Sequence, residues 1–287
     1  MKKILLASTI LVGTAGVAAA DVSFSGSAYA GVGYNLTTDE FAPEVMSDFT
    51  ASMTTVTDGG LEAGASITIT APGVYWNDTY TDSSFGVSTK EAGGISDSSV
   101  YLSGDFGKLA VVYDNDGSTG SDYDVNFVYS NTWGDFGISA YYTMSPDSLG
   151  LGMGTNGDLG ATVTYSFGDY SVYAEYDYDA YDSTAGGAEH LIGFGADATF
   201  SGFSVGVDLD YSVTNDDLDW KADASYTTGP YSIGAFIAED DGGINFDYDF
   251  GATASYDLGG GVSVDAAYTQ DDATDQNLVT LGVSMAF

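Results

Sequence analysis

Hydrophobic and polar residues alternate with a period of two along almost the whole chain after residue 20. In the segment 203–213, one face carries Phe203, Val205, Val207, Leu209, Tyr211 and Val213, and the other carries Ser204, Gly206, Asp208, Asp210 and Ser212. Such a period places alternate side chains on opposite faces of a β-strand. No helical period of 3.6 persists in this region, so the pattern predicts an all-β protein.

Sixteen segments carry the alternation, with a mean length of about ten residues that suits tilted strands crossing a membrane. They span roughly 21–35, 47–57, 61–70, 97–105, 108–114, 122–130, 136–144, 158–167, 170–180, 189–201, 203–213, 218–228, 231–240, 246–258, 261–270 and 277–287.

The connections between these segments alternate in length. Tight turns are expected at Asp58-Gly59-Gly60, Asp105-Phe106-Gly107, Gly134-Asp135, Gly168-Asp169, Ser201-Gly202, Gly229-Pro230 and Gly259-Gly260-Gly261. Mostly longer loops lie around 36–46, 71–96, 115–121, 145–157, 181–188, 214–217, 241–245 and 271–276. An even strand number with short periplasmic turns and longer extracellular loops is typical of a transmembrane antiparallel up-and-down β-barrel.

Aromatic residues gather near the segment ends, where two interfacial girdles of a barrel would lie. Those beside the tight turns are Phe106, Trp133, Phe136, Phe167, Tyr170, Phe200, Phe203 and Tyr231; those near the long loops are Tyr34, Tyr113, Tyr142, Tyr178, Tyr211, Phe246 and Tyr248. The alternative is that tyrosine and phenylalanine are simply common in strands.

The first twenty residues differ from the rest. Lys2 and Lys3 precede an apolar run that ends in Ala18-Ala19-Ala20, as in a cleaved secretory signal peptide. We therefore expect a signal at 1–20 and a single barrel domain at 21–287. No later stretch reaches the ~18 continuous apolar residues of a membrane helix.

Composition narrows the possible partners. After the signal, Lys90, Lys108 and Lys221 stand against 42 acidic residues, which excludes nucleic acid as a partner. The hydrophobic content of 44% and the aromatic content of 14% are too high for a disordered acidic chain. The absence of cysteine excludes disulfides and thiolate chemistry.

If the apolar face meets lipid, the polar face lines a water-filled lumen. The period of two then predicts a pore lining of Glu62, Asp124, Glu175, Asp177, Asp179, Asp197, Asp208, Asp210, Asp219, Lys221, Asp223, Asp247, Asp249, Asp257 and Asp265. Fixed carboxylates attract cations and repel anions, so we expect a cation preference that weakens as salt rises. The alternative is that these acids only solvate a hydrophilic face.

Two further groups of residues are candidates for metal binding or catalysis. Asp114, Asp116 and Asp122 have part of the spacing of a Ca²⁺ loop, but the glycine and glutamate of that motif are missing. Ca²⁺ or other divalent ions could also bridge the acidic outer loops at 239–241 and 271–272, although solvated loops are commoner, and no cofactor is required. His190 is the only histidine. Nothing marks a catalytic partner for it, so we expect no enzyme.

The chain resembles the general porins of alphaproteobacteria, the Rhodobacter type, over nearly all of 21–287. The likeness is clearest in DVSFSGSAYAGVGYN at the start, VYLSGDFGKLAVVY at 100–113 and the end of the chain, where Phe287 matches the outer-membrane assembly signal. The resemblance implies a homotrimer in the outer membrane of a Gram-negative bacterium, inserted by the outer-membrane assembly machinery, that passes small hydrophilic solutes.

Two departures from these porins concern the constriction. Their inward loop after the fifth strand corresponds here only to DNDGSTG at 114–120, and the long insertion at 71–96 lies where relatives latch onto a neighbouring subunit. The arginine cluster that usually faces acids at the constriction is absent, because the chain has no arginine.

The sequence therefore predicts a porin that forms a passive, water-filled, cation-preferring channel for small hydrophilic solutes and ions. One alternative is a solute-selective channel, in which aromatic residues of 71–96 bind a sugar-like ligand. Others are a structural or adhesive barrel with a closed lumen and a soluble, secreted, acidic β-protein.

Overall fold

The computed structural model describes residues 20–71, 73–77, 86–90, 94–115, 123–144, 157–182, 187–239, 248–271 and 275–287. Its strands are β1 (Asp21–Asn35), β2 (Glu40–Val56), β3 (Glu62–Thr70), β4 (Gly73–Asn77), β5 (Gly86–Lys90), β6 (Gly94–Gly104), β7 (Gly107–Asn115), β8 (Tyr123–Trp133), β9 (Phe136–Met144), β10 (Leu159–Phe167), β11 (Tyr170–Asp182), β12 (Gly187–Phe200), β13 (Phe203–Ser212), β14 (Asp217–Thr228), β15 (Tyr231–Glu239), β16 (Asp249–Gly259), β17 (Val262–Asp271) and β18 (Gln276–Ala286). The predicted signal at 1–20 lies, except for Ala20, outside the described residues.

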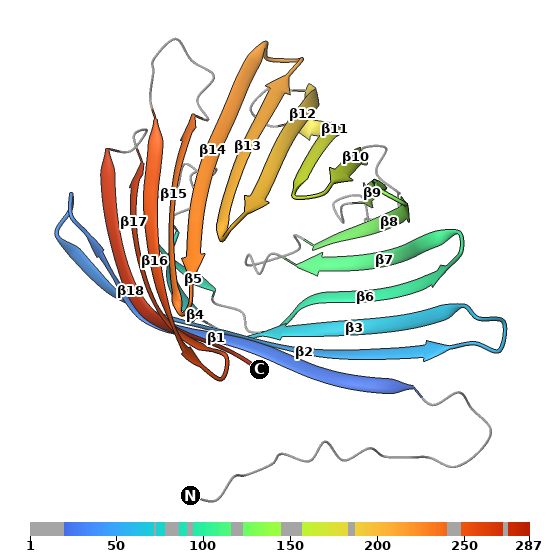
Figure 1. Cartoon of the computed structure of the whole chain (residues 1–287), viewed down its shortest axis with the longest axis horizontal. Helices are drawn as coiled ribbons and strands as arrows, with labels where there is room; N and C mark the ends of the chain where they lie inside the picture. The colour runs from blue at the N-terminus through green and yellow to red at the C-terminus, as the bar shows by residue number, and fades with distance from the viewer. Residues whose placement is uncertain are drawn as a thin grey trace, which may run out of the picture.

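Sixteen of these strands close into an antiparallel barrel. β1 pairs with β2 along one edge and with β18 along the other, and β3 pairs directly with β6, so the hairpin β4–β5 is an insertion between them. In Figure 1 the strands curve round in chain order, and the blue β1 lies beside the red β18 where the ring closes. The predicted sixteen-stranded barrel is confirmed.

The two ends of the barrel differ in their connections, as predicted. Six of the seven tight turns leave two residues between strands and the β2–β3 turn leaves five, whereas each connection between barrel strands at the other end leaves at least four. The tight turns use backbone conformations that glycine favours. At the β12–β13 hairpin, Ser201 and Gly202 both have positive φ, 50° and 85°. A two-residue loop with this geometry matches the twist of the strands that it joins.

The expected boundaries agree closely with the strands except in β2, where the prediction of a loop at 36–46 is wrong. The turn covers only 36–39, and β2 starts at Glu40. This first part of β2 extends beyond the end of β3, whose pairing begins at Asp48. A strand with a free edge tolerates Pro43, which has no N–H to donate. The inserted β4 covers part of this edge, since Val74 pairs with Val45.

Apolar side chains point outward rather than into a core. Among the described residues, the buried hydrophobic side chains are Ala42, Ala238 and Leu278. By contrast, Val100 is 64% exposed and Ile233 is 58% exposed, as a lipid-facing surface requires. A helix with the length and apolarity needed to cross a bilayer is absent from the described part of the chain.

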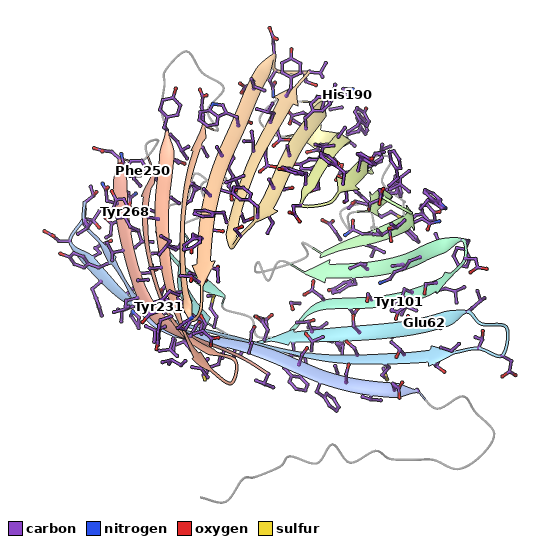
Figure 2. All side chains as sticks on the ribbon, in the orientation of Figure 1. Glu62, Tyr101, His190, Tyr231, Phe250 and Tyr268 are labelled. Atoms are coloured by element: carbon purple, nitrogen blue, oxygen red, sulfur yellow. The ribbon has the colours of Figure 1, made fainter. Side chains whose placement is uncertain are left out.

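Aromatic rings gather at both ends of the strands, the arrangement predicted for the two girdles. At the short-turn end, the ring centroids of Tyr231 and Tyr256 lie 4.9 Å apart. At the loop end, those of Phe250 and Tyr268 lie 5.9 Å apart. Figure 2 shows Tyr231 near one end of the barrel wall, with Phe250 and Tyr268 toward the other.

Candidate pore lining

Strand register assigns the predicted acids to the inner face. In β10–β13, Thr162, Glu175, Gly193 and Asp210 stand side by side in consecutive strands. The residues next to them in sequence are exposed apolar side chains such as Val163, Phe194 and Leu209. All of the predicted lining residues fall on this inner face except Asp247, which lies outside the described residues.

The largest group of inner carboxylates lies on β11–β14, and we call it the acidic wall. Its predicted members are Glu175, Asp177, Asp179, Asp197, Asp208, Asp210, Asp219 and Asp223. Lys221 stands opposite Asp208 in the register of β13 and β14.

Carboxylates of the acidic wall converge two at a time above glycines. A β-carbon added to Gly193 would lie 2.6 Å from Glu175 Oε1 and 2.7 Å from Asp210 Oδ1. One added to Gly206 would lie 2.8 Å from Asp223 Oδ1 and 3.2 Å from Asp197 Oδ1. Glycine at these positions therefore leaves room for like charges to approach one another, which deepens the local negative potential.

The opposite side of the ring carries mainly hydroxyl groups, since β3 and β13 stand eight strands apart in the ring of sixteen. We call Thr50, Ser52, Ser66, Thr68 and Ser99 of β2, β3 and β6 the hydroxyl wall. Its members bond one another across strands: Thr50 and Thr68 hydroxyls are 2.9 Å apart, and those of Ser66 and Ser99 are 2.7 Å apart.

The sequence prediction missed several inner charges on this side. Glu44 and Asp48 of β2, Asp97 of β6 and Lys108 of β7 all face inward. Glu44 was missed because its segment was expected to be a loop. Asp48 and Asp97 stand near the predicted ends of their segments, where the face of a residue is hardest to assign, although the strict alternation of 47–57 and 97–105 was a usable signal.

Tyrosines of the inner face, which were not among the predicted lining residues, donate hydrogen bonds to carboxylates. Tyr29 donates to Glu44 at 3.1 Å and Tyr101 donates to Glu62 at 2.7 Å. In the same way, Tyr141 donates to Asp177 at 2.6 Å and Tyr173 donates to Asp208 at 2.7 Å. Figure 2 labels Tyr101 and Glu62 next to each other on β6 and β3. The wall thus combines aromatic rings with acids.

His190 lies on the outer face of β12 near the loop end (Figure 2). Its Nδ1 is 2.8 Å from the Tyr176 hydroxyl, and its ring centroid is 5.0 Å from that of Tyr178. The imidazole is therefore part of an aromatic cluster that faces away from the lumen.

Asp158 lies just before β10, and its carboxylate accepts a hydrogen bond of 2.9 Å from the Ala180 N–H. Partial burial raises the pKa of Asp158, and the charge of Asp179 raises it further, against the lowering effect of the Ala180 bond. Asp158 therefore takes up a proton at a higher pH than an ordinary aspartate does.

The predicted calcium loop is not described, because Asp116 and Asp122 lie outside the described residues, as does the side chain of Asp114. Within the part of the chain that the structure describes, no three histidine, cysteine or acidic side chains are grouped so that they could hold a metal ion. Divalent binding at the outer loops stays a prediction.

Comparison with models of known protein families identifies the family of this chain. The model described as "Gram-negative porin" matches residues 7–276. The chain belongs to the Gram-negative porin family. This porin is therefore an outer-membrane channel, and the predicted family resemblance and location are confirmed.

Solved structures agree with the fold. A point mutant of Rhodopseudomonas blastica porin superimposes with a TM-score of 0.69 at 17% identity, covering 93% of this chain and 100% of that one. Two further mutants of the same protein give TM-scores of 0.68 and 0.66 at 16% identity, with the same coverage. At this identity the likeness concerns the fold alone. No curated protein matches this porin.

Proposed function

We propose that this porin passes small hydrophilic solutes and ions passively and prefers cations. The observation that carries the proposal is the charge of the inner face. Among the described inner side chains, the acidic wall and the acids near the hydroxyl wall face only Lys108 and Lys221. Fixed carboxylates raise the local concentration of cations and lower that of anions.

The wall geometry supports a graded preference rather than strict selection. At ~0.15 M salt the screening length is ~8 Å, so charges on the wall of a wide pore act only on ions that pass close to them. Paired carboxylates such as Glu175 and Asp210 are the strongest sources of this potential, because their charges add at short range.

A reversal potential in a planar bilayer under a KCl gradient tests the proposal. We expect the sign for K⁺ preference and a permeability ratio P(K⁺)/P(Cl⁻) clearly above one at low salt, because fixed carboxylates attract K⁺ and repel Cl⁻. A chloride preference would refute the cation preference, and the absence of any conductance would favour a barrel with a closed lumen.

We also propose that residues 1–20 are removed on export, that Phe287 is part of the assembly signal and that the barrel forms a homotrimer. The resemblance described above supports all three. Mass spectrometry of the purified protein would test the first, since a mature chain starts at Asp21. Native mass spectrometry in detergent would test the trimer.

A further inference from the structure

One tyrosine of the inner face already has an ammonium group above its ring. Lys108 Nζ lies 4.1 Å from the centroid of the Tyr101 ring. The hydroxyl of the same tyrosine donates to Glu62, and its ring end occupies the place where Gly64 lacks a β-carbon. Ring, carboxylate and glycine thus form a seat in which the chain binds its own ammonium group by cation–π attraction.

The same three components recur at Tyr141, on the side of the lumen toward the acidic wall. The Tyr141 ring reaches from β9 across Gly160 of β10, and its hydroxyl donates to Asp177 of β11 at 2.6 Å. A side chain at position 160 would meet both this ring and the Asp177 carboxylate. The glycine therefore lets the ring lie against the wall, and Tyr141 remains 36% exposed.

The surroundings of Tyr141 carry more negative charge than those of Tyr101. Asp158, Glu175 and Asp177 all act electrostatically on Tyr141. Glu175 in turn lies within electrostatic reach of Asp177, Asp208 and Asp210. Lys108 is on β7 and already lies over Tyr101. The other described lysine side chain, Lys221, is on β14, five strands away from the Tyr141 strand β9.

We infer that Tyr141, Asp177 and Glu175 form a binding site for organic ammonium ions that enter the lumen. The ring face takes the ammonium group by cation–π attraction, and the carboxylates neutralise its charge. A second ammonium group a few ångströms away meets Glu175 and Asp210, so linear diamines fit better than monoamines. This inference rests on the proposed cation preference and names organic ammonium ions as a class of cation that the pore binds.

Current block by 1,4-diaminobutane, compared with block by Mg²⁺, tests the site. Both ions carry two charges, but Mg²⁺ keeps its hydration shell and gains little from a ring. We expect the diamine to block at lower concentration. Tyr141→Leu weakens block by the diamine about three- to fivefold and leaves block by Mg²⁺ unchanged, whereas Tyr141→Phe, which keeps the ring, retains the diamine block.

Removing the Lys108 ammonium group from the Tyr101 ring provides an independent test with a matched control. Lys108→Gln removes the tethered ammonium and strengthens the diamine block at least twofold. The double variant Lys108→Gln, Tyr101→Leu has the same charge without the ring and loses this gain. This pair of variants tests whether a tyrosine ring beside a carboxylate and a glycine binds the diamine, even where Tyr141→Leu fails to form channels.

Three results would overturn the inference: equal block by the two ions in the wild type, an unchanged diamine block in Tyr141→Leu, or the same gain with and without the Tyr101 ring. None of these depends on the sign of the KCl reversal potential. Since the tyrosine substitutions change no charge, a failed cation preference would show in the reversal potential alone and would stay distinguishable from a failed ammonium site.

Discussion

The acidic wall and the hydroxyl wall face each other across the lumen and differ in how their carboxylates are arranged. Near the hydroxyl wall, Asp48 accepts a hydrogen bond from Thr70 at 2.5 Å, and Asp97 accepts one from Ser96 at 3.1 Å. Each of these acids has its own hydroxyl donor. On the acidic wall, Glu175 meets Asp210 and Asp197 meets Asp223 over single glycines.

The comparison shows that the number of acids alone does not set the potential of a pore wall. Both walls supply hydroxyl donors, since Ser171 donates to Asp197 and Tyr173 donates to Asp208 on the acidic wall. The difference lies in the convergence of like charges, which adds their potentials at short range. The inner carboxylates therefore approach one another most closely on the side of β11–β14. Arginine is not needed for such a transverse asymmetry.

The largest expected change in the permeability ratio P(K⁺)/P(Cl⁻) comes from neutralising the carboxylates of each wall in turn. Replacing Glu175, Asp208, Asp210 and Asp223 by their amides is expected to lower P(K⁺)/P(Cl⁻) about two- to fivefold. The same number of amides at Glu44, Asp48, Glu62 and Asp97 is expected to lower it by less than half as much, because these charges do not converge. Reversal potentials in planar bilayers measure both, and equal losses would contradict the difference between the walls.

A smaller effect is expected from ionic strength, which should change the cation preference of the wild type more than that of the variant neutralised on the acidic wall. Raising salt from ~0.1 M to ~1 M shortens the screening length from ~10 Å to ~3 Å, so the wild-type cation preference should fall. The variant neutralised on the acidic wall should change less, since it has lost the charges that are being screened. Reversal potentials at a constant gradient and two mean concentrations give the slopes, and parallel slopes would count against the prediction.

A glycine substitution tests whether the close approach on the acidic side matters for stability. Gly160→Ala places a methyl group against the Tyr141 ring and the Asp177 carboxylate, and overpacking of this kind costs about 1–3 kcal/mol in the free energy of unfolding. In the control Gly137→Ala, the nearest atom, Thr164 Cβ, is 3.8 Å away, so we expect a change within about 0.5 kcal/mol. Urea unfolding in detergent measures both; an equal cost would refute the argument.

The smallest expected effect concerns pH. Because the pKa of Asp158 is raised, this carboxyl loses its charge at a higher pH than an ordinary aspartate does. The wild-type cation preference should therefore begin to fall at a slightly higher pH than that of Asp158→Asn, which has no charge to lose there. Reversal potentials between pH 7 and pH 4 would show this, and identical curves would exclude a role of Asp158.

The strands were predictable because the alternation of apolar and polar residues within each segment shows which side chains share a face. Phe203 to Tyr211 alternate with Ser204 to Asp210, and this local pattern suffices for a strand and for the side on which Asp208 and Asp210 lie. The same pattern failed at 40–46, where Pro43 and two glutamates resemble a loop; only the free edge beyond β3 makes a strand possible there.

Contacts between strands were not predictable, because register decides them. Glu175 and Asp210 are 35 positions apart, and nothing in either segment tells that they converge above Gly193. Tyr141 appears as one more strand former until the pairing of β9, β10 and β11 places its hydroxyl on Asp177. The acids of the lumen could be named from the sequence, whereas their arrangement into two unlike walls could not.

The seam between the two ends of the chain has a consequence for biogenesis. Gly26 and Phe287 exchange two backbone hydrogen bonds of 3.0 Å, so Phe287 extends the pairing of β1 with β18 by one residue pair. A chain that stops short leaves polar backbone groups of β1 open to lipid, where they find no water. Pairing of β1 with β18 is therefore a requirement for a barrel that can stay in the bilayer.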